Sequence, residues 1–333
     1  MKHMQFITEV GQQVLAGQSI TMDQAVALSQ IPDQDLSFLL AMADKIRQKF
    51  VGDEVDLCVI VNGRSGKCTE DCSFCAQSMH HKAQINVYPL MSENELVAAA
   101  KQAEANGSNR FSIVTSGRGA EQDKDFGKIL GALARIQAET KLKVCASLGT
   151  LSTENARALK AAGVSRYHHN VETSRSYYGG ICTTHTYNDR ANTIKAAHEA
   201  GLEVCSGGII GMGESMQQRL EMAFELRELG VHSVPINILN PIKGTAMADQ
   251  PPLRPMEILR IFALFRFIMP ETGIRTAGGR EVNLRDLQSV GLMSGLSGML
   301  IGGYLTTGGR DSGMDLQMVK DMGRVALSAR EGN

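Results

Sequence analysis

The chain has 333 residues, of which 43% are hydrophobic and 21% are charged, so it can bury a large core. Its formal net charge of −1 provides no overall field that would draw it to nucleic acid or a membrane surface, and no apolar run is long enough to cross a bilayer. The N-terminal stretch is interrupted by Glu9, Gln12 and Gln13 and lacks the apolar block of a signal peptide, which predicts a cytoplasmic protein.

The first fifty residues precede the first predicted strand. Residues 21–50 have the pattern of two helices. We therefore expect residues 1–50 to form an N-terminal helical extension that covers the base or the side of the main fold.

Beyond residue 50, short runs rich in Val and Ile alternate with helical stretches. Strands are predicted at residues 56–62, 110–116, 142–149, 165–172, 202–210, 232–239, 273–279 and 298–303. Helices are predicted between them at residues 92–107, 122–138, 152–163, 187–201, 215–230 and 255–270. Four helices end at a glycine just before the next strand, which is typical of parallel sheets: Gly107, Gly163, Gly201 and Gly230.

Eight strand–helix units over roughly 250 residues predict an α/β fold, a (β/α)₈ TIM-type barrel. An open, doubly wound sheet is the alternative. The sequence has no low-complexity segment or long linker, so we expect one domain. Within it, the barrel would span residues 56–303 and a C-terminal segment residues 304–333.

Three closely spaced cysteines follow the first strand, in the stretch GKCTEDCSFCAQ. Cys68, Cys72 and Cys75 have the spacing C-x₃-C-x₂-C. Structural zinc needs four ligands, which His80 and His81 could complete. Ferredoxin-type sites use a fourth nearby cysteine, and none follows here within ten residues. Three thiolates on a [4Fe–4S] cluster would leave one iron open, and an open metal position is where a substrate or cofactor binds.

This motif, with Phe74 before its last cysteine, resembles the radical S-adenosylmethionine (SAM) superfamily. The resemblance implies that Cys68, Cys72 and Cys75 hold a [4Fe–4S] cluster whose open iron chelates the amino and carboxylate groups of SAM. One electron would then cleave the sulfonium and release a 5′-deoxyadenosyl radical. The resemblance also places Phe74 against the adenine.

Further motifs narrow the resemblance. Together with the cysteine motif, the chain resembles the biotin synthase family over roughly residues 20–325 through the segments YHHNVETS, TTHTYNDR, CSGGIIGMGES, VPINIL, GGREVN and YLTTGG. This implies insertion of sulfur between two saturated carbons of dethiobiotin, with SAM as cofactor and sulfur drawn from an auxiliary iron–sulfur cluster. A carbon radical is needed because no side-chain pKa approaches that of an alkane. The resemblance also implies a flavodoxin or ferredoxin as electron donor, and a homodimer.

The auxiliary-cluster residues depart from the usual pattern of the family. Cys145, Cys205 and Arg275 match family positions that bind this cluster, but Ser112 stands where a further cysteine is usual. A serine oxygen is a poor substitute for a soft thiolate. Cys58 offers a replacement. It lies on the first predicted strand, and Cys145, Cys205 and Arg275 lie on the third, fifth and seventh; side chains from alternate strands form one layer inside a barrel. We expect these four residues to hold either a [2Fe–2S] or a four-iron cluster. Taken singly, each cysteine could instead be a small buried apolar residue.

Polar residues near the ends of later strands take roles from the same resemblance. Asn170 and Glu172 lie two apart, on one face of the fourth strand. The matching family residues contact SAM, with the Asn also touching the ureido ring of the substrate and the acid binding the ribose hydroxyls. Arg190 would pair with the SAM carboxylate, and Asn237 would hold the ureido ring.

The remaining predictions concern the rim of the barrel. Thr306 and Thr307 could supply hydroxyls or amides to the dethiobiotin carboxylate. Cys182 belongs to the loop after the fourth strand and is interpreted as non-ligating. The glycines of GGIIGMGE, at residues 207–214, would allow close backbone approach to SAM.

Two other functions fit part of this sequence. One is a different radical SAM barrel enzyme, such as a hydrogenase-maturation enzyme or a methylornithine synthase; the auxiliary cysteines with Arg275 and Asn237 favour sulfur insertion instead. The other is an electron-carrying iron–sulfur protein. Such proteins are small and close all four metal ligands, which this sequence does not.

Overall fold

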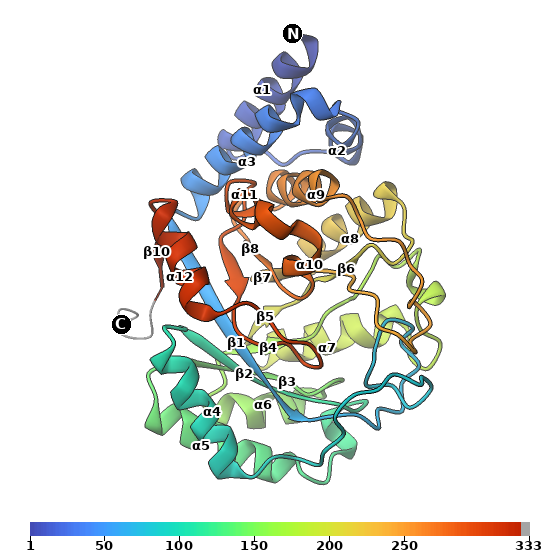
Figure 1. The fold of residues 1–333 in the computed structure, drawn as a ribbon, viewed down its shortest axis with the longest axis vertical. Helices are drawn as coiled ribbons and strands as arrows, with labels where there is room; N and C mark the ends of the chain where they lie inside the picture. Colours follow the sequence, from blue (N-terminus) through green and yellow to red (C-terminus); the bar gives the residue numbers. More distant parts are fainter. Residues whose placement is uncertain (328–333) are drawn as a thin grey trace.

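Runs of β-branched residues form a closed parallel barrel in the computed structural model, which describes residues 1–327 (Figure 1). β1 pairs in parallel with both β2 and β9, and this pairing closes the sheet. The predicted barrel is therefore confirmed, and the open doubly wound alternative is wrong. The strands are β1 (Glu54–Arg64), β2 (Arg110–Thr115), β3 (Lys143–Ser147), β4 (Arg166–His168), β5 (Glu203–Cys205), β6 (Gly208–Ile210), β7 (Ser233–Ile238), β8 (Gly273–Thr276), β9 (Gly298–Leu300) and β10 (Val325–Ala326).

Helices surround the barrel and connect its strands (Figure 1). They are α4 (Glu93–Ala105), α5 (Phe126–Glu139), α6 (Thr153–Ala161), α7 (Tyr187–Glu199), α8 (Met216–Glu228), α9 (Pro255–Ile268), α10 (Arg280–Leu284), α11 (Gln288–Leu292) and α12 (Ser312–Asp321). α4 begins with the predicted capping box, in which Ser92 and Glu95 bond each other's backbone N–H groups. Gly107, Gly163, Gly201 and Gly230 all have positive φ, as expected for glycines that end helices.

Most strands differ in length from their predictions, and two of these differences affect the site. The strand predicted at residues 202–210 is interrupted at Ser206 and Gly207, so that β5 and β6 occupy one position of the barrel. The strand predicted at residues 165–172 ends at His168. Its continuation includes Glu172, whose φ of +69° is not found in a regular strand.

The N-terminal extension contains three helices, α1 (Lys2–Leu15), α2 (Met22–Ser29) and α3 (Leu36–Phe50). α2 and α3 are the two predicted helices, and α1 was not predicted. α2 and α3 pack on α9, with α1 against α3, so the extension covers the outer side of the barrel (Figure 1). An ion pair between Arg260 of α9 and Asp33 at 2.7 Å joins the two parts.

The C-terminal segment returns to the start of the barrel. β10 pairs in parallel with the first residues of β1, Glu54 with Val325 and Val55 with Ala326. Residues 328–333 of the predicted segment lie outside the described residues. Across residues 1–327, no helix has both the length and the apolar character needed to cross a membrane.

Candidate functional site

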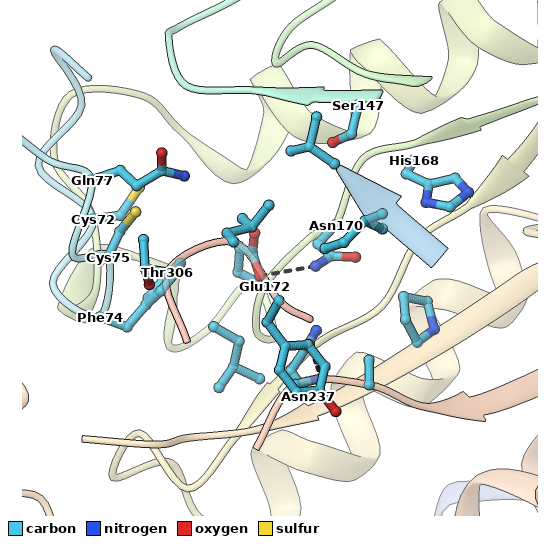
Figure 2. A pocket seen from close by; sticks show the side chains of 18 of the residues that line it. Cys72, Phe74, Cys75, Gln77, Ser147, His168, Asn170, Glu172, Asn237 and Thr306 are labelled. Carbon is cyan, nitrogen blue, oxygen red and sulfur yellow. Dashed lines mark hydrogen bonds between the residues drawn. The ribbon is translucent and has the colours of Figure 1, made fainter. Parts of the chain in front are cut away.

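A cavity lies at the carboxyl end of the barrel strands, the usual place for active sites in this fold. Figure 2 shows Cys72, Phe74 and Cys75 on one side of it and His168 on the other, with Asn170 and Glu172 between them. Every strand position of the barrel contributes a lining residue: Cys58, Val114, Ser147, His168, Cys205, Asn237, Arg275 and Leu300. Cys68 and Phe74, from the loop after β1, also line the cavity.

The loop after β1 gathers the three predicted SAM-cluster cysteines. Cys68 N donates to the Gln77 carbonyl at 3.0 Å, and Met79 N donates to the Cys68 carbonyl at 2.8 Å, so the loop folds back on itself. A tight turn from Cys72 to Cys75 puts both side chains on the cavity wall. Burial raises the pKa of the Cys75 thiol to about 11, and the nearby Cys68 adds to this effect. Three thiols held in one short loop are suited to binding a cation, so this donor set fits a metal cluster.

The two histidines after this loop do not favour the zinc alternative. His80 Nε2 lies 3.0 Å from the Thr69 carbonyl oxygen, and His81 Nε2 lies 3.0 Å from the Cys72 carbonyl oxygen. A ring nitrogen that faces a carbonyl at this distance carries a proton and donates it. This leaves Nδ1 as the possible ligand atom of each ring, but neither histidine lines the cavity that the three cysteines share.

Three predicted SAM-binding residues form one group, in which Arg190 is buried and Asn170 and Glu172 are half-buried. Asn170 Nδ2 donates to the Glu172 carboxylate at 3.3 Å (Figure 2), and Arg190 Nη1 donates to the Asn170 carbonyl at 2.9 Å. Arg190 also lies 3.5 Å from the Glu172 carboxylate. Burial raises the pKa of Glu172, and the positive charge of Arg190 opposes this rise. The strained backbone of Glu172 belongs to a class found most often at functional sites, and the carboxylate lines the cavity.

Asn237 on β7 is held by two hydrogen bonds to the backbone. Its Oδ1 accepts from Gly278 N at 2.9 Å, and its Nδ2 donates to the Gly208 carbonyl at 3.3 Å. A side-chain amide has two donors and two lone pairs, so one of each remains for a ligand. This pair is complementary to a urea, which presents both donors and an acceptor. Thr306 and Thr307, in the loop after β9, line the same cavity.

The four predicted auxiliary-cluster residues lie near one another inside the barrel, and all are buried. Burial raises the pKa of the Cys58 thiol to about 12; Arg275 opposes this rise, whereas Cys145 and Cys205 add to it. The thiols are therefore close enough to influence one another. Cys58, Cys205 and Arg275 line the cavity, and Cys145 is fully buried in β3, in register with Ser112 on β2.

Several buried polar atoms around these cysteines lack a hydrogen-bond partner among residues 1–327. They include Ser112 Oγ, Arg275 Nη1 and His168 Nε2, and His168 is in register with Cys205. Native proteins rarely leave such atoms unsatisfied. Three thiols beside unpaired donors fit an anionic group of iron and sulfide, which accepts hydrogen bonds.

A charged network below the cysteines was missed in the sequence. Asp56 Oδ2 lies 2.7 Å from Arg275, 3.2 Å from Arg110 and 3.5 Å from Arg166. Burial opposes ionisation of Asp56, but the three guanidinium groups hold its pKa well below the usual range. Glu203 lies beside Arg166. The network therefore contains three positive side chains, those of Arg275, Arg110 and Arg166, and two negative ones, those of Asp56 and Glu203. Burial raises the pKa of Cys145, whereas the positive charges of Arg110 and Arg166 oppose this rise. The excess positive charge therefore favours the thiolate form of Cys145.

Cys182 was interpreted as a non-ligating residue on the rim. The structure places it after β4, outside the auxiliary group, but beside the other set of cysteines. Its Sγ lies 3.8 Å from Cys72 Sγ. Next to it in the same loop, the Ile181 carbonyl accepts a hydrogen bond from Ser73 N. No feature of local sequence indicates this contact, because the two residues are 110 positions apart.

Gly207 is the point where the β5–β6 segment crosses closest to β7. A Cβ atom at this position would lie 2.0 Å from the Pro235 carbonyl oxygen. Gly207 N also donates to Asn170 Oδ1 at 3.2 Å. The predicted role of this glycine was close approach to SAM; the approach that the structure describes is to a neighbouring strand.

We expect Gly207→Ala to push β6 away from β7 and to destabilise the fold by about 1–3 kcal/mol, the usual cost of overpacking. The measurement is urea unfolding followed by circular dichroism. Gly179→Ala is the matched control, because a Cβ there meets nothing within 4 Å. Equal unfolding midpoints for the two variants would contradict the packing argument.

Comparisons with known proteins give consistent results. A family model described as the Radical SAM superfamily matches residues 64–239, and one described as the Biotin and Thiamin Synthesis associated domain matches residues 235–325. The biotin synthase of Carboxydothermus hydrogenoformans is 53% identical over 318 residues, which are 95% of this chain and 98% of that protein. The biotin synthase of Clostridium acetobutylicum is 51% identical over 317 residues, 95% of this chain and 97% of that protein.

Solved structures with the same fold are more distant in sequence. A methylornithine synthase matches with a TM-score of 0.85 at 18% identity, over 97% of this chain and 98% of that chain. A maturase of the [FeFe]-hydrogenase matches with a TM-score of 0.82 at 18% identity, over 97% of this chain and 75% of that chain. At this identity the likeness concerns the fold alone.

Proposed function

The chain belongs to the biotin synthase family of the radical SAM superfamily, and on this premise we propose which of its residues carry the reaction. The activity is insertion of sulfur into dethiobiotin to give biotin. The observation that carries the assignment of residues is that two separate groups of cysteines meet one cavity. The hydrogenase-maturase and methylornithine-synthase alternatives have no comparable support, since those proteins share 18% identity with the chain against about 50% for the biotin synthases.

The first group of cysteines would hold the SAM-binding [4Fe–4S] cluster. These are Cys68, Cys72 and Cys75, and Phe74 would pack against the adenine of SAM. When bound, this cluster supplies the electron that cleaves SAM, and the auxiliary cluster supplies the sulfur atom. Glu172 would accept hydrogen bonds from the ribose hydroxyls, and Arg190 would pair with the SAM carboxylate.

The substrate would lie between the two groups of cysteines. Asn170 and Asn237 would bind the ureido ring through side-chain amides that the backbone already holds in place. This fixes the ring without further loss of side-chain entropy. Thr306 and Thr307 would bind the carboxylate at the other end of dethiobiotin.

The second group of cysteines would hold the auxiliary cluster. Cys58, Cys145 and Cys205 would supply three soft thiolate ligands. Arg275 would be the fourth residue at the cluster, and its side chain is positively charged. Three thiolates with one different position suit a four-iron cluster better than a [2Fe–2S] cluster. Anaerobic quantification of iron and sulfide with Mössbauer spectroscopy tests this proposal: eight irons per chain support it, and six oppose it.

The electron donor and the assembly are also proposed from the family. A flavodoxin or ferredoxin would deliver the electron, and the chain would form a homodimer. The two-component test is formation of 5′-deoxyadenosine and biotin from SAM and dethiobiotin with each reduced carrier, alongside sedimentation analysis of the holoenzyme.

We expect Asn170→Ala and Asn237→Ala each to weaken dethiobiotin binding. Each leaves buried urea groups unpaired, at about 1–3 kcal/mol, which corresponds to about a 5- to 150-fold rise in Kd. Iron content should not change, because neither residue is proposed as a ligand. Isothermal titration of the anaerobic protein gives the measurement.

Asn192→Ala, at an exposed position of α7, is the control for this pair. It should bind dethiobiotin as the unmodified chain does. Unchanged affinity in both cavity variants would count against the assignment of the ureido site.

A further inference from the structure

Cys182 and His185, to which the proposed reaction assigns no role, lie beside Cys72. Cys182 Sγ is 3.8 Å from Cys72 Sγ, 3.2 Å from His185 Nδ1 and 3.8 Å from His185 Nε2. One ligand atom from each of the three residues can be chosen so that all lie within 4.8 Å of one another, and all three residues are buried. The group joins the cysteine loop to the segment between β4 and α7.

These separations match those of ligands on a single metal ion. With metal–sulfur distances of about 2.3 Å and tetrahedral angles, two sulfur ligands lie about 3.8 Å apart. A sulfur and an imidazole nitrogen at about 2.0–2.1 Å from the same ion lie about 3.5–3.6 Å apart. The observed sulfur–sulfur distance equals the first value, and the two sulfur–nitrogen distances fall on either side of the second.

Glu70 orients the histidine of this group, and Asp71 lies against its cysteine. Glu70 Oε2 lies 2.7 Å from His185 Nδ1, which leaves Nε2 to bind a metal. Asp71 accepts from Thr183 N at 2.9 Å and lies 3.1 Å from Cys182 Sγ. Carboxylates that fix a ligating histidine in this way are a regular part of metal sites and strengthen them.

We propose that Cys72, Cys182 and His185 form a second metal site, which holds one thiol-seeking divalent cation such as Fe²⁺ or Zn²⁺ while the SAM cluster is absent. Cys72 belongs to both sites, so the ion and the cluster exclude each other. Three protein ligands leave a fourth position for water. The site therefore gives the cluster-free chain a place to bind a first iron next to the loop where the cluster is built.

Cobalt titration of the full chain tests this site, because Co²⁺ reports thiolate ligation by visible absorption. The chain is stripped of iron anaerobically and carries Cys58→Ser, Cys68→Ser and Cys75→Ser, so that Cys145 and Cys205 are the remaining thiols outside the proposed site. We expect one equivalent of bound Co²⁺ with a thiolate-to-cobalt absorption band. Adding Cys182→Ser should abolish both, and Glu70→Gln should weaken binding about 10- to 100-fold through the loss of His185 orientation.

Controls separate ligation from misfolding. Cys205→Ser in the same background removes a thiol elsewhere and should leave the equivalent of Co²⁺ in place. His185→Gln removes another proposed ligand and should also abolish Co²⁺ binding. Circular dichroism checks that each variant is folded. A folded Cys182→Ser chain that still binds one equivalent with an unchanged band would overturn the proposal.

In the unmodified chain, assembly of the cluster should release the bound Co²⁺, since Cys72 cannot serve both. Retention of Co²⁺ after the cluster has formed would also contradict the shared ligand. This test is independent of the proposed function: cobalt binding does not require SAM or dethiobiotin, and failure of biotin synthesis would leave its outcome unchanged.

Discussion

Replacing any one of Cys68, Cys72 and Cys75 by alanine is expected to abolish SAM cleavage. Each change removes one of three thiols that the loop after β1 brings to the cavity wall. Two thiolates cannot hold a cluster that three hold with one position left open. We expect 5′-deoxyadenosine formation to fall by at least about a thousandfold, or about 4 kcal/mol of activation free energy.

The measurement is 5′-deoxyadenosine released by the reduced, anaerobically reconstituted protein, together with iron per chain. Ser73→Ala is the control within the same loop, because its hydroxyl is not a proposed ligand while its backbone N–H bonds Ile181. Normal 5′-deoxyadenosine from any one of the three cysteine variants would show that the assignment of this cluster is wrong.

Cys58→Ser is expected to separate the two halves of the reaction. The variant should still cleave SAM, because Cys68, Cys72 and Cys75 are intact. It should lose the iron of the auxiliary cluster and form almost no biotin, at least about a hundredfold less than the unmodified chain, since a hard oxygen replaces a soft thiolate. Iron per chain and biotin per chain, measured side by side, give the test.

Ser112→Ala is the companion to this variant. Its hydroxyl is not a proposed ligand and would give the auxiliary cluster no more than a hydrogen bond, so removing it should leave iron content intact. A Cys58→Ser protein with full iron and full biotin would refute the ligand role. Cys58 would then be one more small buried residue of β1.

The barrel could be predicted because its strands and helices each have a local signal. Runs of Val and Ile mark the strands, and glycines with positive φ mark where helices end. The interruption between β5 and β6 has no such signal, since it depends on how close Gly207 lies to the Pro235 carbonyl on another strand. β10 was also missed, because two residues pair only where β1 supplies the edge.

Some residues of the candidate site could likewise be predicted from the sequence, and others could not. The family resemblance indicated Cys145 and Cys205, and the position of Cys58 on another odd-numbered strand added it as a candidate of the same barrel layer. Asp56 and Arg166 were missed because a charge near the start of a strand usually faces water. Only closure of the barrel turns them toward Arg275. The approach of Cys182 to Cys72 likewise depends on two loops meeting.

The pairing of β1 with β9 has a consequence for how the chain is made. β1 is among the first parts of the barrel to leave the ribosome, yet Cys58 pairs in register with Leu300, and Glu54 with Val325. Translation must therefore be nearly finished before the barrel can close around Cys58. Until then this thiol is open to water and oxidants. Delivery of iron and sulfide to the proposed auxiliary site would accordingly follow release of the chain, whereas residues 68–75 leave the ribosome much earlier in synthesis.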